Sequence, residues 1–261
     1  MLTAVFLGLY WLAARRAFSE VGGFARQALD EGVETATLAG ATLLGLSMFA
    51  TLFLGTILVV FLTLGAVRGD AERGLLQPLV ARPLGRTALL VARLVGAGAC
   101  GGLYVAVVYA ACVVITRQAG GWTPDRLVLP ALELVGAVVL VAAISILGSV
   151  FLSGTANGIA VFMVFGAGLT AGLLGQVGEA IGSETLIDVA RITSWVLPFE
   201  ALYQDGLGNL TADTRGLTRL AVDLGPFGGA QSVGPGFAPY VLAYLAGLVG
   251  LSAWAFARRD L

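Results

Sequence analysis

Residues 67–93 read VRGDAERGLLQPLVARPLGRTALLVAR; they follow one apolar run, residues 41–66, and lead into another, residues 89–115. Each run is long enough to cross a bilayer as a helix, because about 20 apolar residues span a hydrocarbon core of ~30 Å. Residues 67–93 carry five arginines. Arginine-rich loops between closely spaced spans face the cytoplasm. We therefore predict a membrane protein whose orientation is set by this segment.

The whole sequence has the composition of a membrane protein. Hydrophobic residues make up 58% of the 261 residues and charged residues only 12%, and the mean hydropathy is +0.92. A soluble domain of this size carries more polar surface. Three further apolar runs have spanning length, residues 127–152, 158–177 and 237–257. We predict an all-α fold, a polytopic helical bundle that forms a single transmembrane domain over residues 1–261.

A sixth apolar run, residues 1–14, is several residues too short to cross a membrane. It does not resemble a signal peptide, because no basic residue precedes it and Arg15 and Arg16 follow it directly. Two interpretations remain: an interfacial helix that does not cross, or the outer half of a first span whose start is missing or lies partly in the interface. We favour the second, which gives six transmembrane helices with both ends in the cytoplasm.

The distribution of charge agrees with this topology. Alternation from the basic segment places three segments inside, residues 67–93, 153–157 and 258–261, and three outside, residues 15–37, 117–126 and 178–236. The inside segments hold seven arginines in 36 residues, and the outside segments hold eight in 92. Basic residues are thus denser inside, as the positive-inside rule requires. We predict a multi-pass protein of a bacterial or archaeal cytoplasmic membrane, with the loop 67–88 and the C-terminus in the cytoplasm.

Two residue types are missing, and their absence excludes several kinds of site. The chain has no histidine, and all fifteen basic residues are arginine. A phosphate-binding loop of the G-x-x-x-x-G-K-[ST] type needs a lysine, so this chain has no ATPase site of that kind. A histidine-dependent triad and a histidine-ligated zinc site are excluded for the same reason. We predict no catalytic residue, cofactor or metal in this chain, and no nucleic-acid partner.

Glu133 is the only carboxylate within a predicted span. Ionisable residues inside membranes commonly mark functional sites, which makes Glu133 a candidate for an ion-coupled carrier. It lies only about one and a half turns from the outer end of the run 127–152, and we favour the interpretation that it reaches interfacial water. The sequence shows no pair of proline-broken spans and no inverted repeat, which are typical of such carriers.

The long outer segment, residues 178–236, contains two short predicted helices. The first, residues 184–197, is typical of a helix in the membrane interface, with Trp195 at the headgroup level. Its apolar face carries Leu186, Val189, Thr193 and Val196. Pro198 ends this helix, and the second is predicted over residues 199–207. The pair forms either a lid over the bundle or an exit gate.

Two glycine pairs at i and i+4 fall in predicted spans, Gly98 with Gly102 and Gly168 with Gly172. Such spacing lets helix backbones approach closely. Because glycine is abundant, at 37 residues, we expect these pairs to serve packing within the subunit rather than a dimer contact.

A short amphipathic helix is predicted within the basic segment. Its apolar stripe consists of Leu75, Leu76, Leu79 and Val80. Asp70 and Glu72 lie toward its first turn. Arg82 and Arg86 lie at or beyond its last turn, so the charges at both ends suit the helix dipole, and Pro83 ends the helix. Such a helix either packs on the membrane interface or docks into a groove of a cytoplasmic protein.

This segment resembles the coupling loop of type-2 ATP-binding-cassette (ABC) transporter permeases, in which an acidic stretch precedes a pattern like G-T-L-x-x-L-L-x-x-P-x-x-R. The residues that fit are Gly74, Leu76, Leu79, Val80, Pro83 and Arg86. Leu75 stands where the family has threonine, and Pro78 is less usual there. TSWVLPFEALY, residues 193–203, is similar to the family's outer segment after its fifth span, and AFARRDL, residues 255–261, is similar to its basic tail. The first span departs from the family, which has a cytoplasmic helix and a full span there.

The resemblance implies a permease subunit without catalytic residues. It would pair with a second copy or a sister permease, and with two ABC ATPase subunits that hold ATP and Mg²⁺. Export is the favoured direction of transport, and lipid surrounds the spans. The expected contact with the ATPase consists of Asp70, Glu72, Arg73, Gly74, Leu76, Leu79, Arg82, Pro83 and Arg86. Two alternatives remain open: an ion-coupled secondary transporter and a non-transporting membrane scaffold.

Overall fold

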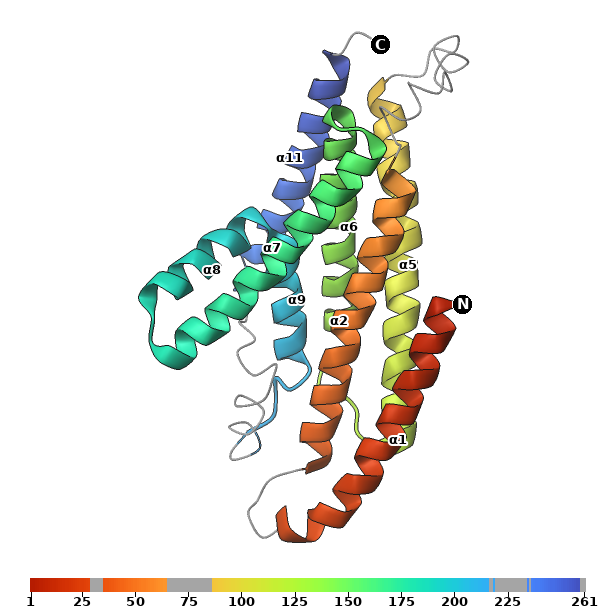
Figure 1. Cartoon of the computed structure of the whole chain (residues 1–261), viewed down its shortest axis with the longest axis vertical. Helices are drawn as coiled ribbons and strands as arrows, with labels where there is room; N and C mark the ends of the chain where they lie inside the picture. Colours follow the sequence, from red (N-terminus) through yellow and green to blue (C-terminus); the bar gives the residue numbers. More distant parts are fainter. Residues whose placement is uncertain (29–34, 65–85, 216–217, 219–233, 235, 259–261) are drawn as a thin grey trace.

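The computed structural model describes residues 1–28, 35–64, 86–215, 218, 234 and 236–258 (Figure 1). All regular structure in these residues is helical. The helices are α1 (Leu2–Ala28), α2 (Thr35–Thr63), α5 (Arg86–Gly120), α6 (Val128–Phe151), α7 (Gly154–Ile181), α8 (Glu184–Val196), α9 (Pro198–Asn209) and α11 (Phe237–Ala257). Five of them, α2, α5, α6, α7 and α11, are long and apolar enough to cross a membrane. The described residues thus confirm an all-helical bundle and the five longer predicted spans.

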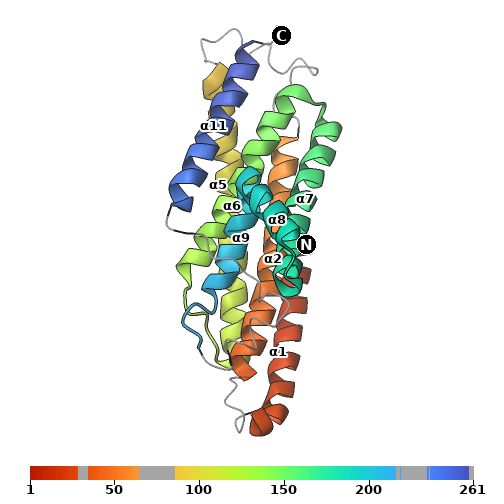
Figure 2. The ribbon, with the colours of Figure 1, turned by 90° about the vertical axis from the view of Figure 1, so that its left-hand side faces the viewer.

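Helix α6 lies at the centre of the bundle, where it packs against α2, α5, α7, α9 and α11 (Figures 1 and 2). Its buried side chains are almost all apolar, among them Leu134, Val138 and Val141. Leu44 and Met48 of α2 belong to the same core. A helix that is apolar on all sides is stable only when other helices or lipid surround it, which explains why α6 takes the central position.

The two glycine pairs pack within the subunit, as expected. In α5, Gly98 and Gly102 face valines of α6. In α7, Gly168 and Gly172 face α9, and a Cβ on Gly168 would lie 2.6 Å from the Phe199 ring. Larger residues at Gly102 or Gly168 would push the helices apart, whereas a Cβ on Gly98 would make an ordinary contact with Val139. The packing role of both pairs is therefore confirmed.

Helix α1 is longer than the apolar run 1–14 and continues through Arg15 and Arg16. The arginines do not end the helix because both are exposed, whereas Ala14 is fully buried and Phe18 packs against α5 on the opposite side. An arginine on the outer face of a helix interrupts the apolar run in the sequence but not the backbone. Helix α1 is not among the five helices that meet the length and composition of a span.

The start of α1 lies about halfway along α5 (Figure 1). There the hydroxyls of Thr3 and Tyr104 share a hydrogen bond of 3.0 Å. From this point α1 runs beside α5 until Phe18 packs on Gly120 at the end of α5. Helix α1 therefore lies along the half of α5 that ends at Gly120. This is the half that the charge distribution assigns to the outside, where residues 1–14 were expected to lie.

Helices α8 and α9 confirm the two short helices predicted before the last span. Helix α8 ends at Val196, before Pro198, and Pro198 is the first residue of α9, one residue before the predicted start of the second helix. The residues predicted to share one face of α8 lie mostly on its exposed side, where a helix in the membrane interface would meet lipid. Leu186 is half-buried, but Val189 and Val196 are 44% and 56% exposed. The buried residue is Ala190, because α7 and α9 pack against α8 on the side of its smallest residue.

The position of α9 was not predicted. Helices α7 and α8 form an antiparallel hairpin that turns at Gly182, whose φ is 68°. Helix α9 then returns into the bundle and packs along α6, so that most of its residues are buried (Figures 1 and 2). Phe199 anchors it, with its ring stacked on Phe165 at a centroid distance of 5.6 Å. Helix α9 is therefore part of the bundle interior rather than a lid above it.

Candidate functional site

Eight of the nine predicted ATPase contacts lie outside the described residues: Asp70, Glu72, Arg73, Gly74, Leu76, Leu79, Arg82 and Pro83. The ninth, Arg86, is the first residue of α5, and only its backbone is described. The helices that lead into and out of this segment, α2 and α5, are described. Helix α2 ends at Thr63 and α5 begins at Arg86, at the end of the bundle where α11 also finishes (Figure 1). This is the end that the charge distribution assigns to the cytoplasm.

Three buried polar side chains, Thr63, Ser145 and Asn157, form an inner polar junction at this end. Thr63 Oγ1 donates to Ser145 Oγ at 2.6 Å. Asn157 Nδ2 donates to the Ser145 carbonyl at 3.0 Å and lies 3.3 Å from Ser145 Oγ. The three side chains are at most 1% exposed. Gly148 provides the space for Asn157, because a Cβ there would overlap Asn157 Oδ1.

The inner polar junction connects three helices. Thr63 belongs to α2, Ser145 to α6 and Asn157 to α7. Leu64, the next residue after α2, also packs against Gly154 and Gly158 of α7. The last turn of α2 is therefore fixed to the centre of the bundle directly before residues 65–85. The sequence had assigned Asn157 to a short loop, 153–157, but α7 begins at Gly154 and buries it.

Four side chains form an outer polar cluster toward the other end of the bundle: Arg126, Glu133, Asp205 and Asn209. Asn209 is at its centre: Oδ1 accepts from Arg126 Nη1 at 3.0 Å, and Nδ2 donates to Glu133 Oε1 at 3.3 Å and to the Asp205 carbonyl at 2.9 Å. Glu133 is only 7% exposed. The expectation that it reaches interfacial water is wrong, because α9 covers it.

A second acid of α9, Glu200, lies between α9 and α7. Its Oε1 accepts from Gln204 Nε2 at 2.9 Å, and Gln204 in turn accepts from Gln176 Nε2 at 3.3 Å. Gly172 lets the carboxyl approach α7, because a Cβ there would overlap it. Burial raises the pKa of the Glu200 carboxyl, and the hydrogen bond from Gln204 opposes this shift. Helix α9 is not one of the five candidate spans.

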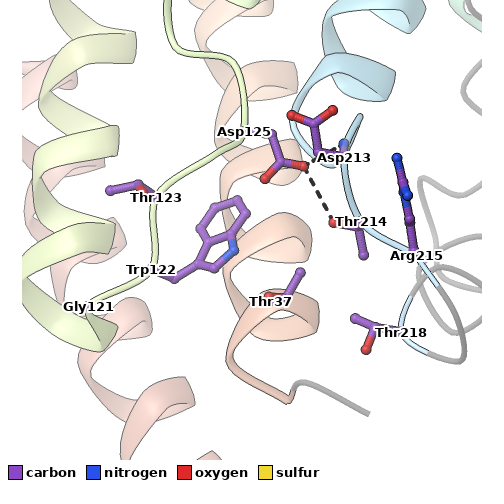
Figure 3. Close-up of a pocket in the computed structure, with 9 residues that line it drawn as sticks. All are labelled: Thr37, Gly121, Trp122, Thr123, Asp125, Asp213, Thr214, Arg215 and Thr218. Atoms are coloured by element: carbon purple, nitrogen blue, oxygen red, sulfur yellow. Dashed lines mark hydrogen bonds between the residues drawn. The ribbon is translucent and has the colours of Figure 1, made fainter. Parts of the chain in front are cut away.

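A polar cavity of about 550 Å³ lies beyond the outer polar cluster (Figure 3). Its lining consists of Thr37, Gly121, Trp122, Thr123, Asp125, Asp213, Thr214, Arg215 and Thr218. Asp125 Oδ2 accepts from the Asp213 backbone at 2.9 Å and so joins the loop before α6 to the chain after α9. Trp122 forms one wall, since its ring packs on Gly40. The carboxylates, hydroxyls and guanidinium that line the cavity suit a polar solute. Within the described residues, no three or more His, Cys, Asp or Glu side chains lie together as a metal site.

Sequence reasoning missed the acids and amides of α9. A signal was available: Glu200 and Gln204 form one i, i+4 pair, and Asp205 and Asn209 form another on nearly the opposite side of the helix. The sequence predicted a helix over residues 199–207, without a role for these side chains. That Asp205 and Asn209 lie near Glu133 could not be predicted without the position of α9.

Neither models of known protein families nor the sequences of characterised proteins match this chain. The structure and composition establish a multi-pass helical membrane protein with five candidate spans. Its described polar groups include the inner polar junction at the end of α2 and the outer polar cluster between α6 and α9.

Proposed function

We propose that this chain is the permease subunit of a type-2 ABC transporter, driven by ATP hydrolysis in separate ATPase subunits, with export as the direction of transport. The observation that carries the proposal is the coupling-loop motif in the sequence between α2 and α5. The end of α2 and the start of α5, which flank the motif, lie at the end of the bundle where α11 finishes, and the inner polar junction is at the end of α2. A partner that binds this segment would act on the bundle through α2.

Two further features support the proposal. Residues 193–203, which are similar to the outer segment of the family, form the end of α8 and the start of α9, between the last two candidate spans. The lack of lysine excludes a phosphate-binding loop in this chain, so ATP hydrolysis would belong to a partner. Both features fit a subunit that transmits the movement of a partner ATPase to its own transmembrane helices.

The proposed mechanism transmits a displacement through packed helices. ATP-driven closure of the ATPases would push on residues 70–86 and thereby on the end of α2. Because Thr63 is bonded to Ser145, and Ser145 to Asn157, the displacement would move α6 and α7 together with α2. Helix α6 packs against α9, so the movement would reach the outer half of the bundle. Packed interfaces transmit such movements because they deform little.

The test is purification of the tagged chain from its native membrane, followed by identification of a bound P-loop ATPase and measurement of ATP hydrolysis. Arg82→Glu and Gly74→Trp are expected to reduce ATPase binding or transport-stimulated hydrolysis while the chain still inserts. Arg117→Glu is the matched control, because Arg117 is exposed in the last turn of α5, at the opposite end. Full stimulation in both loop variants, or a competent chain without an ATPase, would contradict the proposal.

One observation favours a second candidate function, an ion-coupled secondary transporter. Glu133 is buried against Asp205 and Asn209 rather than exposed, and intramembrane acids often lie on ion pathways. This candidate predicts transport by the purified chain alone in liposomes under an ion gradient, and its loss in Glu133→Gln. Transport that depends on an added ATPase and survives Glu133→Gln would reject it.

A further inference from the structure

The polar cavity of about 550 Å³ carries charges of both signs on its walls (Figure 3). Asp125 and Asp213 supply two carboxylates. Arg215 supplies a guanidinium, on the side of the cavity opposite to Trp122 and Asp125. Among the described residues no ion pair joins Arg215 to either acid, and no hydrogen bond reaches the Asp213 carboxylate. A ligand that carries both charges can therefore lie between the acids and the guanidinium.

The walls of the cavity are held in place by the protein itself. The Asp125 N–H donates to the Leu210 carbonyl at 3.1 Å, and Asp125 Oδ2 accepts from the Asp213 N–H at 2.9 Å. These two bonds join the loop before α6 to the chain after α9. Trp122 joins the same loop to α2, because its ring packs on Gly40 so closely that a Cβ there would overlap it. Since the walls are already assembled, binding costs little ordering entropy.

Neutral hydrogen-bonding groups complete the lining. They are the hydroxyls of Thr37, Thr123, Thr214 and Thr218. Among the described lining residues, Trp122 is the one large apolar side chain. An apolar solute would therefore bury little surface here, whereas a charged solute would meet partners on several sides. The volume falls within the range of about 300–1,000 Å³ for small-molecule sites, so a small solute fits together with some of its hydration water.

The cavity lies at the outer end of the bundle, past the hydrocarbon core. Gly121, one of its lining residues, directly follows α5. Helix α5 rises about 40 Å between Arg93 and Gly120, at about 1.5 Å per residue. A hydrocarbon core is only ~30 Å thick, and Arg93 ends the basic segment that the charge distribution assigns to the cytoplasm. A ligand would therefore reach the cavity from the water outside.

We propose that this cavity binds a free amino acid. The ammonium group would lie against Asp125 and Asp213, and the carboxylate against Arg215, whose planar guanidinium can donate two parallel hydrogen bonds to a carboxylate. The bound amino acid would add a further link between the loop before α6 and the chain after α9. This site is separate from the coupling loop and goes beyond the proposed permease function.

The first test is equilibrium binding of radiolabelled alanine to the full chain in phosphatidylcholine nanodiscs. Alanine is the probe because the proposed contacts involve only the two charged groups that all amino acids share. N-acetylalanine lacks the ammonium group and alaninamide lacks the carboxylate. Each should need about a fivefold higher concentration than unlabelled alanine to displace the label, the upper value for one exposed charge pair. Absence of saturable alanine binding, or equal displacement by all three compounds, would overturn the proposal.

The second test removes the charges from the protein. Asp213→Asn and Arg215→Gln should each weaken alanine binding about fivefold. Both variants should fold, because neither side chain makes a hydrogen bond or ion pair among the described residues. Glu20→Gln in α1 and Arg117→Gln in α5 are the matched controls, since both residues are exposed and neither lines the cavity. Full affinity in both cavity variants, or equal losses in the controls, would disprove the site.

The third test separates a free amino acid from a lipid headgroup with the same pair of charges. Alanine binding is repeated in nanodiscs that contain phosphatidylethanolamine. Unchanged affinity supports the free amino acid. Loss of alanine binding, together with displacement of alanine by soluble phosphoethanolamine in phosphatidylcholine nanodiscs, would assign the cavity to the lipid headgroup and contradict the proposal. None of these readouts depends on an ATPase or on transport, so this proposal and the proposed function fail separately.

Discussion

The hydroxyl of Thr63, at the last residue of α2, lies 2.6 Å from the hydroxyl of Ser145 in α6. Both groups are buried, and Asn157 of α7 bonds to Ser145 from the other side. The bond therefore connects the helix that leads into residues 65–85 with the central helix of the bundle. Under the proposed function, a force applied to that segment would reach α6 at the last residue of α2.

Thr63→Val removes the donor of this bond and keeps the shape of the side chain. We expect a loss of about 0.5–1 kcal/mol in the free energy of unfolding, the usual size of an interhelical hydrogen bond in membrane proteins. Under the proposed function, ATPase stimulation should fall further than the loss of folded protein explains. The control is Thr170→Val, whose hydroxyl is exposed and bonds only within α7, to Gly166. Equal effects of the two variants on stimulation would argue against transmission through Thr63.

The contact between α2 and α5 depends on Gly101. A Cβ on Gly101 would overlap Val59 of α2, so Gly101→Ala is expected to destabilise the protein by about 1–3 kcal/mol through overpacking. Val59→Ala should restore part of this loss in the double variant. Gly96→Ala, in the same helix but with nothing within 4 Å of its Cβ, should be neutral or stabilising because alanine is the better helix former. Thermal unfolding in detergent measures all four proteins, and absence of rescue by Val59→Ala would disprove the contact.

The end of α8 is attached to α11 through two tyrosines. Tyr240 donates to the Trp195 carbonyl and packs its ring edge-to-face on Trp195, and Tyr244 donates to the Val196 carbonyl at 2.8 Å. These carbonyls belong to the last turn of α8, where no helical donor follows. The double variant Tyr240→Phe/Tyr244→Phe should keep the rings and increase hydrogen exchange around residues 195–200. Unchanged exchange there would mean that the rings alone hold α8.

The five long spans could be predicted because each needs only length and apolar composition, and α6 shows the strongest case, being the most apolar of the five. Helix α1 was cut short because Arg15 interrupts the apolar run while lying on an exposed face of a continuous helix. A linear count of apolar residues does not distinguish these two situations. Ala14 and Phe18 lie on one face of a helix that continues past Arg15, but that this face is buried is seen only from the position of α5.

The candidate site was less predictable. Glu133 was identified as an unusual acid, but its surroundings depend on Asp205 and Asn209, which come from a helix more than 70 residues away. No local pattern states that α9 returns into the bundle. The coupling loop is the opposite case: its residues, Asp70 to Pro83, were identified by motif and lie outside the described residues, so their contacts stay predictions.

Glu200 gives a pH-dependent prediction. Burial raises the pKa of its carboxyl above the ordinary value, so folding favours the protonated form. The stability that this form contributes is complete below the ordinary glutamate pKa of about 4.3 and is lost as the pH rises through the folded-state pKa. Glu200→Gln keeps an acceptor for Gln204 and never ionises. We therefore expect it to unfold at a higher temperature than the wild type at alkaline pH, with the difference shrinking toward acidic pH. The control for the substitution itself is Glu184→Gln, at an exposed acid of α8. A constant difference across the pH range would mean that Glu200 does not titrate between the two states.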